Sequence, residues 1–378
     1  MVGGYKTVKL RGHRTKCSKG AALLLLASVG VATAQKVPTP ARIWSVGPLT
    51  KNEPVMGITI GGGGATVTAP HVDSQTNSIF AATRSVVFAG DRIVLASMVG
   101  MRNVDAAQRP EQVYQLLSLD ARTGEVKDSR ELVDFGVRAI FATNDAHVIV
   151  SGAAVLRLTP DLKDDARFDY HATGHKFGRV QNASPDGATL GNATSPGFEL
   201  IETRTLKARE LTADPAVDTS VSNMGFVTDN VHWIRDYPKD RGFITYTDTS
   251  GTHLLYHGKC GGRPQFLTDD LILEPGCKSP LILDTRGNVV RTILLEGAFS
   301  YAGVSQNGKR FALQKASFSG MHSVKHERFG IYAVDTGELI AEVTPDELAE
   351  EQSWTAFSPD GSMFVVGSPL KLTLYGLP

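Results

Sequence analysis

The sequence predicts an all-β fold, a seven-bladed β-propeller of four-stranded antiparallel blades. Three observations support this fold class. A turn of small polar, Asp or Asn and Gly residues recurs roughly every 40–50 residues, a period typical of propellers. Short apolar runs flank each copy, as strands would. A second turn, with Asp first and Gly last, follows most copies at a distance that leaves room for two more strands.

The first turn occurs in seven copies, and each is expected to join the first two strands of a blade. The copies are Ala89-Gly90-Asp91, Thr143-Asn144-Asp145, Ser184-Pro185-Asp186-Gly187, Thr228-Asp229-Asn230, Thr268-Asp269-Asp270, Gln306-Asn307-Gly308 and Ser358-Pro359-Asp360-Gly361. The second turn occurs at Asp120–Gly124, Asp248–Gly251, Asp284–Gly287 and Asp335–Gly337. Asp caps such a turn with its side chain, and Gly adopts a positive φ without strain.

The predicted blades cover most of the chain after residue 84. Their ranges are 84–132, 137–170, 177–213, 222–258, 263–297, 300–343 and 353–378. The last range is one strand short, and Ala41–Val46 reads as a strand without a nearby partner. We therefore expect 41–46 to pair with the last blade and to remove an exposed sheet edge.

Three segments depart from the repeated unit. Pro48–Thr83 is rich in Gly, Ser and Thr and predicts a long loop with a short strand at Gly57–Ile60. Ser317–Arg328 reads as an insertion in the sixth blade. A capping box with Pro in the first helical position predicts one short helix over Pro345–Gln352.

Residues 1–34 have the pattern of a signal peptide. Six Lys or Arg residues precede the apolar run Gly20–Val31, and Ala32-Thr33-Ala34 forms a cleavage site. The run is shorter than the roughly 20 residues that span a bilayer. We expect a cut after Ala34 and a secreted or periplasmic protein, with 35–378 as a single domain and no membrane contact afterwards. An uncleaved anchor is the alternative.

Charge and cysteine content narrow the possible partners. The chain has 39 basic and 39 acidic residues, and residues 35–378 carry a net charge of −6. Such a surface repels nucleic acid, so no nucleic-acid partner is expected. Cys260 and Cys277 follow the predicted cut and, in an exported protein, predict a structural disulfide worth about 3 kcal/mol. A reactive or metal-binding pair is the alternative.

Three turns of this sequence resemble the turns of a known group of propellers, and the resemblance concerns the fold. The two Ser-Pro-Asp-Gly turns at 184–187 and 358–361 and the Asp-x-x-Thr-Gly turn at 120–124 are similar to those of exported bacterial propellers. These propellers form the WD-repeat-like, YVTN and quinoprotein-like group. The resemblance covers the chain after residue 34 and implies a propeller, but it transfers no catalytic residue.

Candidate sites for cofactors and metals are weak in this sequence. Asp120–Glu125 resembles the blade turn of quinone-dependent enzymes, but the Trp that follows it there is missing. The four-residue spacing of two histidine pairs suits metal ligands on a helix, yet both pairs lie in predicted loops. The Asp residues at 161, 164 and 165 and at 269 and 270 lack the spacing of a calcium site. The glycine run Gly61–Gly64 lacks the pattern of a phosphate site. The glycosylation sequons at Asn182 and Asn192 are interpreted as incidental. We therefore expect no cofactor and no metal; the residues considered are His171 and His175, His322 and His326, Asp161, Asp164 and Asp165, Asp269 and Asp270, Gly61–Gly64, Asn182 and Asn192.

The function predicted from the sequence is a non-enzymatic binding scaffold. A complete propeller without an assembled catalytic motif favours loops that bind a protein or an extracellular polymer, in a monomeric chain. The alternative is a lactonase- or lyase-like hydrolase whose residues converge in the central funnel from several blades. Clustered His, Asp, Glu and Arg around a bound metal in the funnel would favour the enzyme, and a funnel without convergent polar groups, beside an apolar patch on the rim, would favour the scaffold.

Overall fold

The computed structural model describes residues 37–47, 57–61, 64–68, 85–102, 111–134, 137, 139–169, 182–193, 197–212, 225–228, 231–235, 243–248, 251–257, 264–274, 279–295, 299–319, 323–345, 353–367 and 371–378. The chain separates into two units, Met1–Lys36 and Val37–Pro378. The first unit lies outside the described residues, so the signal peptide stays a prediction. Within the described ranges, no helix has the length and apolar character needed to cross a membrane.

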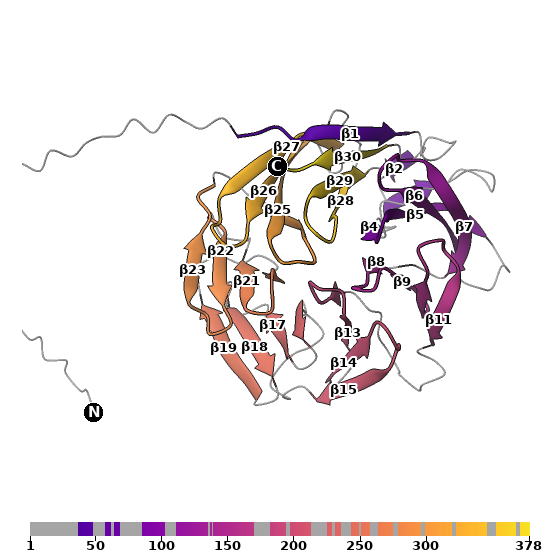
Figure 1. Ribbon diagram of the computed structural model, residues 1–378. Coiled ribbons are helices and arrows are strands. Elements are labelled where there is room, and N and C mark those ends of the chain that lie inside the picture. Colours follow the sequence, from indigo (N-terminus) through magenta and orange to yellow (C-terminus); the bar gives the residue numbers. More distant parts are fainter. Residues whose placement is uncertain are drawn as a thin grey trace, which may run out of the picture. The chain divides into compact units, whose positions relative to one another are not determined.

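The strands form four-stranded antiparallel sheets arranged around a central axis (Figure 1). We call these sheets blades and number them along the chain. In the first six, each strand pairs with the next one in sequence. Blade one contains β4 (Ser85–Ala89), β5 (Arg92–Arg102), β6 (Glu111–Asp120) and β7 (Val126–Asp134); blade two contains β8 (Ala139–Ala142), β9 (Val148–Ser151), β10 (Val155–Leu158) and β11 (Asp164–Phe168); blade three contains β12 (Asn182–Ala183), β13 (Thr189–Ala193), β14 (Gly197–Glu202) and β15 (Ala208–Thr212).

The remaining blades repeat this arrangement, with one change in the last. Blade seven takes its outermost strand, β1 (Ala41–Val46), from the other end of the described chain. Blade four contains β16 (Gly225–Thr228), β17 (Val231–Arg235), β18 (Phe243–Asp248) and β19 (Gly251–His257); blade five contains β20 (Gln265–Phe266), β21 (Leu271–Glu274), β22 (Leu281–Asp284) and β23 (Val289–Thr292); blade six contains β24 (Ser300–Val304), β25 (Arg310–Ser319), β26 (Ser323–Ala333) and β27 (Leu339–Val343); blade seven adds β28 (Trp354–Phe357), β29 (Met363–Gly367) and β30 (Leu372–Gly376) to β1.

The described side chains establish six packed blades, which corrects the expectation of a seven-bladed propeller. Five apolar cores join these blades in one series, from blade five through blades six, seven, one and two to blade three. Blade four is described by its backbone strands alone, and no side-chain core between it and its neighbours is established in the described part of the chain. A count of turns could not reveal this difference, because a turn is a local feature and carries no information about packing between blades.

The segment around β1 contacts three blades in turn. Glu342 N, in blade six, donates a 3.3 Å hydrogen bond to the carbonyl oxygen of Pro38. β1 itself pairs antiparallel with β30 of blade seven. Trp44 Nε1 then donates to the carbonyl oxygen of Ala121 in blade one. The expectation that this strand removes a sheet edge is wrong, because β1 is the outermost strand of its sheet and is largely exposed. Adding a strand moves the unpaired edge outward but does not abolish it.

Two segments that depart from the repeated unit contain paired strands. Within Pro48–Thr83 the short strand predicted at Gly57–Ile60 is confirmed as β2 (Gly57–Gly61); it forms a hairpin with β3 (Gly64–Thr68), in which Gly61 lies opposite Gly64. The predicted insertion Ser317–Arg328 is instead the outer part of the β25–β26 hairpin, paired out to Ser319 opposite Ser323. Polar and small residues there were read as loop, although paired strands accept them on an exposed hairpin. Most of the predicted helix Pro345–Gln352 lies outside the described residues.

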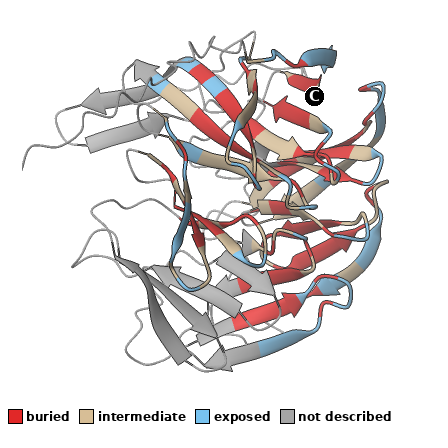
Figure 2. Cartoon of the chain, turned by 60° about the vertical axis from the view of Figure 1, so that its left-hand side comes forward, coloured by how far each residue is buried: buried red, intermediate tan, exposed pale blue. Residues whose placement is uncertain are grey.

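Burial decreases from the middle of a blade to its outermost strand (Figure 2). In blade two every residue of β9 and β10 is buried, whereas β11 is mostly exposed. The middle strands are buried on both faces because neighbouring blades cover both, which explains their nearly continuous apolar sequences.

Candidate functional site

Because each strand of a blade pairs antiparallel with its neighbour, the connections between strands lie alternately on two opposite faces of the ring. We call one the turn face: it carries the tight turns that join the first strand of a blade to the second and the third to the fourth. The opposite face, the loop face, carries the hairpin ends between second and third strands and the crossings between blades. Turns of adjacent blades are bonded to each other, as where Asn307 Nδ2 donates to the carbonyl oxygen of Asp360 over 2.7 Å. The turn face is thus bonded between blades six and seven.

The innermost strands of six blades, β4, β8, β12, β20, β24 and β28, surround a central cavity of about 550 Å³. Its described lining combines apolar side chains with uncharged polar ones. Burial raises the pKa of Tyr301, so its phenol stays protonated at neutral pH. The described lining therefore offers apolar surface and neutral hydrogen-bonding groups to a ligand. Its polar members are Ser184, Gln265, Tyr301, Gln306, Gln314, Ser353 and Thr355.

One buried carboxylate lies behind this lining. Glu327 on β26 is 2% exposed. It accepts hydrogen bonds from the side-chain amide of Gln314, from Ser353 N at 3.1 Å and from Ser353 Oγ at 2.5 Å. The amide oxygen of Gln314 accepts a further bond from Ser300 Oγ at 3.0 Å. A buried carboxylate is tolerated when its oxygens are bonded in this way. Because Gln314 and Ser353 both line the cavity, Glu327 fixes the position of two of its polar groups.

The recurring turn is a closed hydrogen-bonded unit. Its Ser or Thr hydroxyl donates to the Asp or Asn two residues later and accepts a backbone N–H four or five residues later. In blade seven, Ser358 Oγ donates to Asp360 over 2.6 Å and accepts from Met363 N at 2.9 Å. The bond from Ser358, opposed in part by burial, lowers the pKa of Asp360. Three further copies are closed in this way: Thr143 with Asp145, Ser184 with Asp186 and Ser305 with Asn307. The turn at Ala89 has no hydroxyl, and Thr268 Oγ1 instead accepts from Asp270 N at 3.3 Å.

An ion cluster around the buried Arg157, with partly exposed carboxylates, joins blades two and three at the turn face. The side chain of Arg157 is 4% exposed; it donates to Asp145 at 2.7 Å and to Asp165 at 2.5 Å. It also donates to the carbonyl oxygen of Thr203 at 2.9 Å. The ring of His147 lies 3.5 Å from Asp145 and 3.7 Å from Asp165. The guanidinium therefore occupies the space between the two carboxylates.

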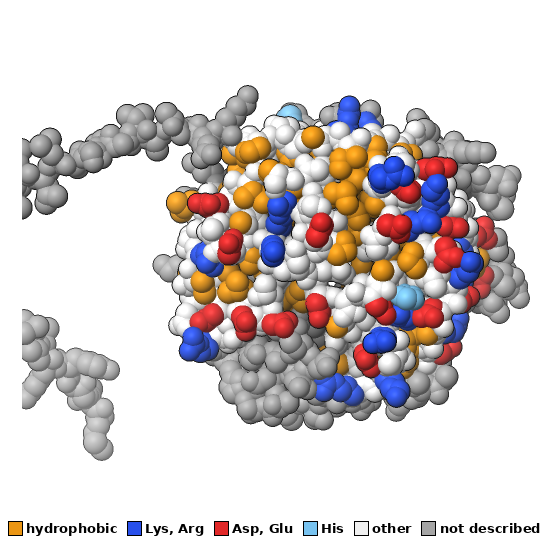
Figure 3. All heavy atoms as spheres, viewed as in Figure 1, with side chains coloured by type: hydrophobic (Ala, Val, Ile, Leu, Met, Phe, Trp, Pro, Cys, Tyr) orange, Lys and Arg blue, Asp and Glu red, His pale blue; other side chains and the backbone are white. Residues whose placement is uncertain are grey.

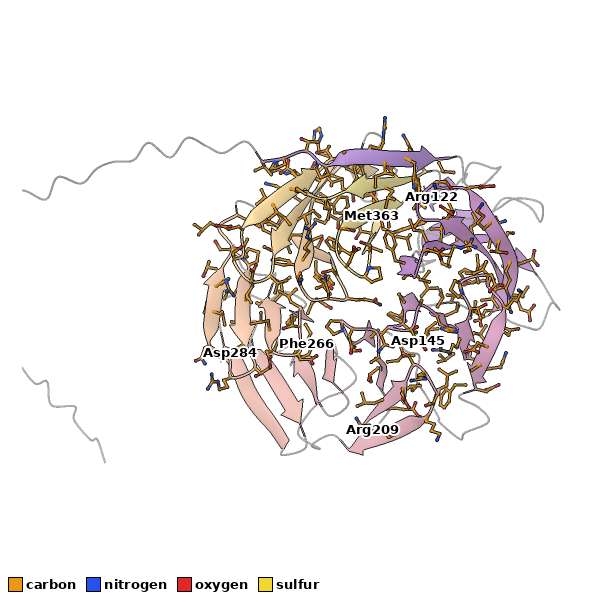
Figure 4. All side chains as sticks on the ribbon, viewed as in Figure 1. Arg122, Asp145, Arg209, Phe266, Asp284 and Met363 are labelled. Carbon is orange, nitrogen blue, oxygen red and sulfur yellow. The ribbon has the colours of Figure 1, made fainter. Side chains whose placement is uncertain are left out.

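The electrostatics of this cluster follow from its geometry. Burial opposes ionisation of Asp145, but hydrogen bonds from Arg157 and Thr143 outweigh it and lower the pKa to about 2. Burial likewise disfavours the charge on Arg157, yet its two carboxylate partners raise its pKa. Within the described residues, no group of three or more His, Cys, Asp and Glu side chains is arranged to hold a metal. Figure 4 labels Asp145 in its place on blade two.

Acidic groups also approach each other across blades three and five. Burial raises the pKa of Asp269, and the negative charges of Asp186 and Asp270 raise it further. On the face shown in Figure 3, acidic and basic side chains are interspersed, with apolar side chains gathered between them.

Two hairpins stand out on the loop face by their length. β5 and β6 contain 11 and 10 residues, and β25 and β26 contain 10 and 11, whereas β9 and β10 contain four each. They belong to blades one and six, the two blades that pack against blade seven. The loop face therefore presents two long hairpins on either side of blade seven.

Several residues singled out in the sequence lie outside the described ranges. These are Cys260, Cys277, His171, His175 and His322, so the disulfide stays a prediction and the interpretation of both histidine pairs is untested. His326 is exposed on β26, opposite Ser317. The Asp120–Glu125 turn, which suggested a quinone enzyme, is held by its own backbone: Asp120 accepts from Thr123 N at 2.8 Å and Arg122 N at 3.0 Å. The first of these bonds is the main cause of its lowered pKa.

Two residues that matter in the structure were missed in the sequence, Arg157 and Glu327. A signal was present for the first: the run Val155-Leu156-Arg157-Leu158 places one cation in an otherwise apolar strand. A cation in that position predicts a buried acidic partner. No comparable signal marks Glu327, which lies in a hairpin rich in polar residues.

The comparisons with known proteins bear on the fold. No protein-family model matches the chain, and no curated protein matches its sequence. A chain from the crystal structure of a mitotic checkpoint complex is 12% identical, with 86% of this chain and 99% of that chain covered and a TM-score of 0.51. The WD40 β-propeller domain of Doa1 is 13% identical, with 78% and 92% covered and a TM-score of 0.49. The fold is a β-propeller. The blade topology and the likeness to the first of these structures agree on this fold.

Proposed function

We propose that this chain is a protein-interaction scaffold that binds a partner protein on its loop face, over blade seven. The observation that carries the proposal is the pair of long hairpins, β5–β6 and β25–β26, on the two blades that flank blade seven. A paired hairpin anchored in a packed ring holds its backbone in a defined course, which lowers the entropy cost of binding. We place the scaffold outside the cytoplasm on the basic and apolar pattern of residues 1–34.

Two further observations support a binding role. Propellers of the WD40 type typically serve protein interaction, and one similar solved chain comes from a protein complex. The described lining of the central cavity is uncharged, which suits binding better than the acid–base chemistry of a hydrolase.

The experiment compares two variants of the exported protein. In the first, residues Ser317–His326 are replaced by Asn-Gly, which shortens the β25–β26 hairpin but leaves Ala316 opposite Glu327. In the second, Arg122→Glu alters the turn face. A partner is first identified by chemical crosslinking to the wild-type protein, purified, and its affinity measured for each variant.

The shortened hairpin should weaken binding by about tenfold or more, as expected when central contacts are lost. The turn-face variant should bind within about twofold of the wild type, as a peripheral charge would. The proposal is wrong if the partner binds the shortened hairpin normally or depends on Arg122 instead.

A further inference from the structure

We propose that β23, the outermost strand of blade five, binds an extended strand of a protein partner whose side chains alternate between apolar and acidic. This inference rests on the proposed function and adds a second contact surface with a defined partner chemistry. β23 lies at the periphery of the ring, at the left in Figure 1. It is last in the strand order β20-β21-β22-β23, so the backbone groups on its outer edge face away from the sheet.

This edge exposes apolar side chains, whereas the outermost strands of blades one and two carry charged ones. Val289 is 50% exposed, Val290 42% and Leu294, just beyond the strand, 87%. By contrast, the outermost strand of blade one contains the sequence Lys127-Asp128-Ser129-Arg130-Glu131, and that of blade two begins with Asp164-Asp165. Proteins commonly place charges on edge strands to prevent pairing with other chains. An edge strand that exposes apolar side chains in place of charged ones is suited to pairing with a strand of another chain.

The side chains of this segment divide between two faces. A Cβ on Gly337 of blade six would lie 3.3 Å from Arg291 Cδ and 2.8 Å from Ile293 Cδ1, so both side chains point toward blade six. The chain stays extended past the strand, because Ile293 N donates to the carbonyl oxygen of Pro280 at 2.8 Å. Successive side chains of an extended chain alternate in direction. Leu294 therefore lies on the opposite face, whereas Val290 lies in a bulge, because Arg291 pairs with Ile282 and Val289 with the next residue, Leu283.

The face toward blade six continues into a small basic pocket. Leu295 lines a cavity of about 140 Å³ together with Phe299, and Lys315 and Arg328 contribute its cations. Lys315 Nζ lies 5.5 Å from the centroid of the Phe299 ring. Arg328 is half-exposed and lies 3.5 Å from Glu342, the one carboxylate in the lining. Two cations and one anion leave the described lining net positive, although residues 35–378 carry a net charge of −6.

These two faces define the chemistry of the partner. A strand added to β23 gains main-chain hydrogen bonds along the edge, and its alternate side chains give specificity. Its apolar side chains would contact Leu294, while its acidic ones would approach Arg291, Lys315 and Arg328. A second copy fits less well, because pairing through β23 would add the cation of another Arg291 to a surface that is already cationic.

The test uses two displayed libraries of eight-residue peptides. Both alternate a varied apolar residue with a charged one, which is Asp or Glu in the first library and Lys or Arg in the second. Selection against the full chain should enrich acidic peptides. Their affinity, measured by fluorescence anisotropy, should fall about tenfold or more for Leu294→Glu and for Arg328→Glu. The matched control Val126→Glu alters an exposed valine on the outer strand of blade one and should leave binding unchanged.

Other results would overturn the inference. They are enrichment of basic peptides, no enrichment, or selected peptides that bind the Leu294→Glu variant as tightly as the wild type. Sedimentation that shows a dimer lost in Leu294→Glu would identify a second copy as the occupant and would also refute it. If the purified partner binds both edge variants normally but not the shortened β25–β26 hairpin, the edge inference fails while the proposed function stands.

Discussion

The indole N–H of Trp44 donates a 2.9 Å hydrogen bond to the carbonyl oxygen of Ala121, 77 residues away in the sequence. The donor lies on β1 at the edge of blade seven, and the acceptor lies in a turn of blade one. The same indole packs against that turn, since a Cβ on Gly124 would lie 2.8 Å from Trp44 Cδ2. One side chain therefore supplies both a polar and an apolar contact across a junction between blades.

Replacing this indole tests the polar contact. Trp44→Phe keeps an aromatic ring but removes the donor, so we expect a loss of about 1 kcal/mol in the free energy of unfolding. Urea denaturation followed by circular dichroism measures it. Ile43→Ala, at an exposed position on the same strand, is the control and should cost less. Equal losses in the two variants would contradict a role for the hydrogen bond.

Gly124 tests the apolar contact. Its φ is +74°, and an added Cβ would approach the Trp44 ring and Val46 Cγ2 to 2.8–2.9 Å. Gly124→Ala should therefore cost about 1–3 kcal/mol through backbone strain and the displaced indole. Gly376→Ala is the matched control beside the same strand, where the new Cβ would be 3.5 Å from Ile43, an ordinary contact. If both variants melt at the same temperature, the predicted strain is absent.

Asp145 predicts a specific dependence of stability on pH. Its folded pKa is about 2, below the ordinary value of 3.8. A carboxylate with a depressed folded pKa stabilises the folded protein above its unfolded pKa, and this contribution disappears as the pH falls through the folded pKa. The melting temperatures of wild type and Asp145→Asn should thus differ most above about pH 4 and converge toward pH 2.

The control for this measurement is Asp91→Asn, because the Asp91 side chain is 90% exposed. Its difference from the wild type should stay small and nearly constant over the same pH range. A gap between wild type and Asp145→Asn that does not narrow on acidification would show that Arg157 contributes little to the ionisation of Asp145.

Glu327 should be needed for the polar end of the central cavity. Glu327→Ala removes the acceptor for Ser353 and for the Gln314 amide, and unpaired buried groups cost about 1–3 kcal/mol each. Glu327→Gln keeps one acceptor oxygen and should cost less. Thermal unfolding and the tryptophan emission of neighbouring Trp354 report the change. An exposed substitution in the same blade, Glu338→Ala, should leave both signals unaltered; a Glu327→Ala variant that behaves like it would refute the prediction.

The turns could be predicted from the sequence because their hydrogen bonds are local. Ser184, for example, bonds to Asp186 and accepts from Thr189, and all three residues lie within one six-residue stretch. The strands on either side follow from the same pattern, since an apolar run must begin and end at such turns. The packing between blades has no local signature. For that reason the turn count did not separate blade four from the six blades whose side chains pack in the described structure.

The candidate site was harder to predict, because its residues come from distant strands. Thr203 lies 46 residues from Arg157, and Ser353 lies 26 residues from Glu327. An isolated arginine in an apolar strand indicates that a buried acidic partner exists, but it does not show which residue the partner is. The β25–β26 hairpin was misread for a different reason. Its outer part is polar and contains small residues, and pairing between two exposed strands needs no apolar alternation.

The pairing of β1 with β30 has a consequence for how the chain folds. Ser45 Oγ and Thr373 Oγ1 lie 2.9 Å apart, although 328 residues separate them. Closing a loop of that length costs about 5 kcal/mol of chain entropy, and contacts so distant in sequence slow folding. During synthesis β1 emerges first and remains without its partner until the last blade is made. A circularly permuted chain in which β1 directly follows β30 should therefore fold faster, because its last blade becomes a local hairpin meander.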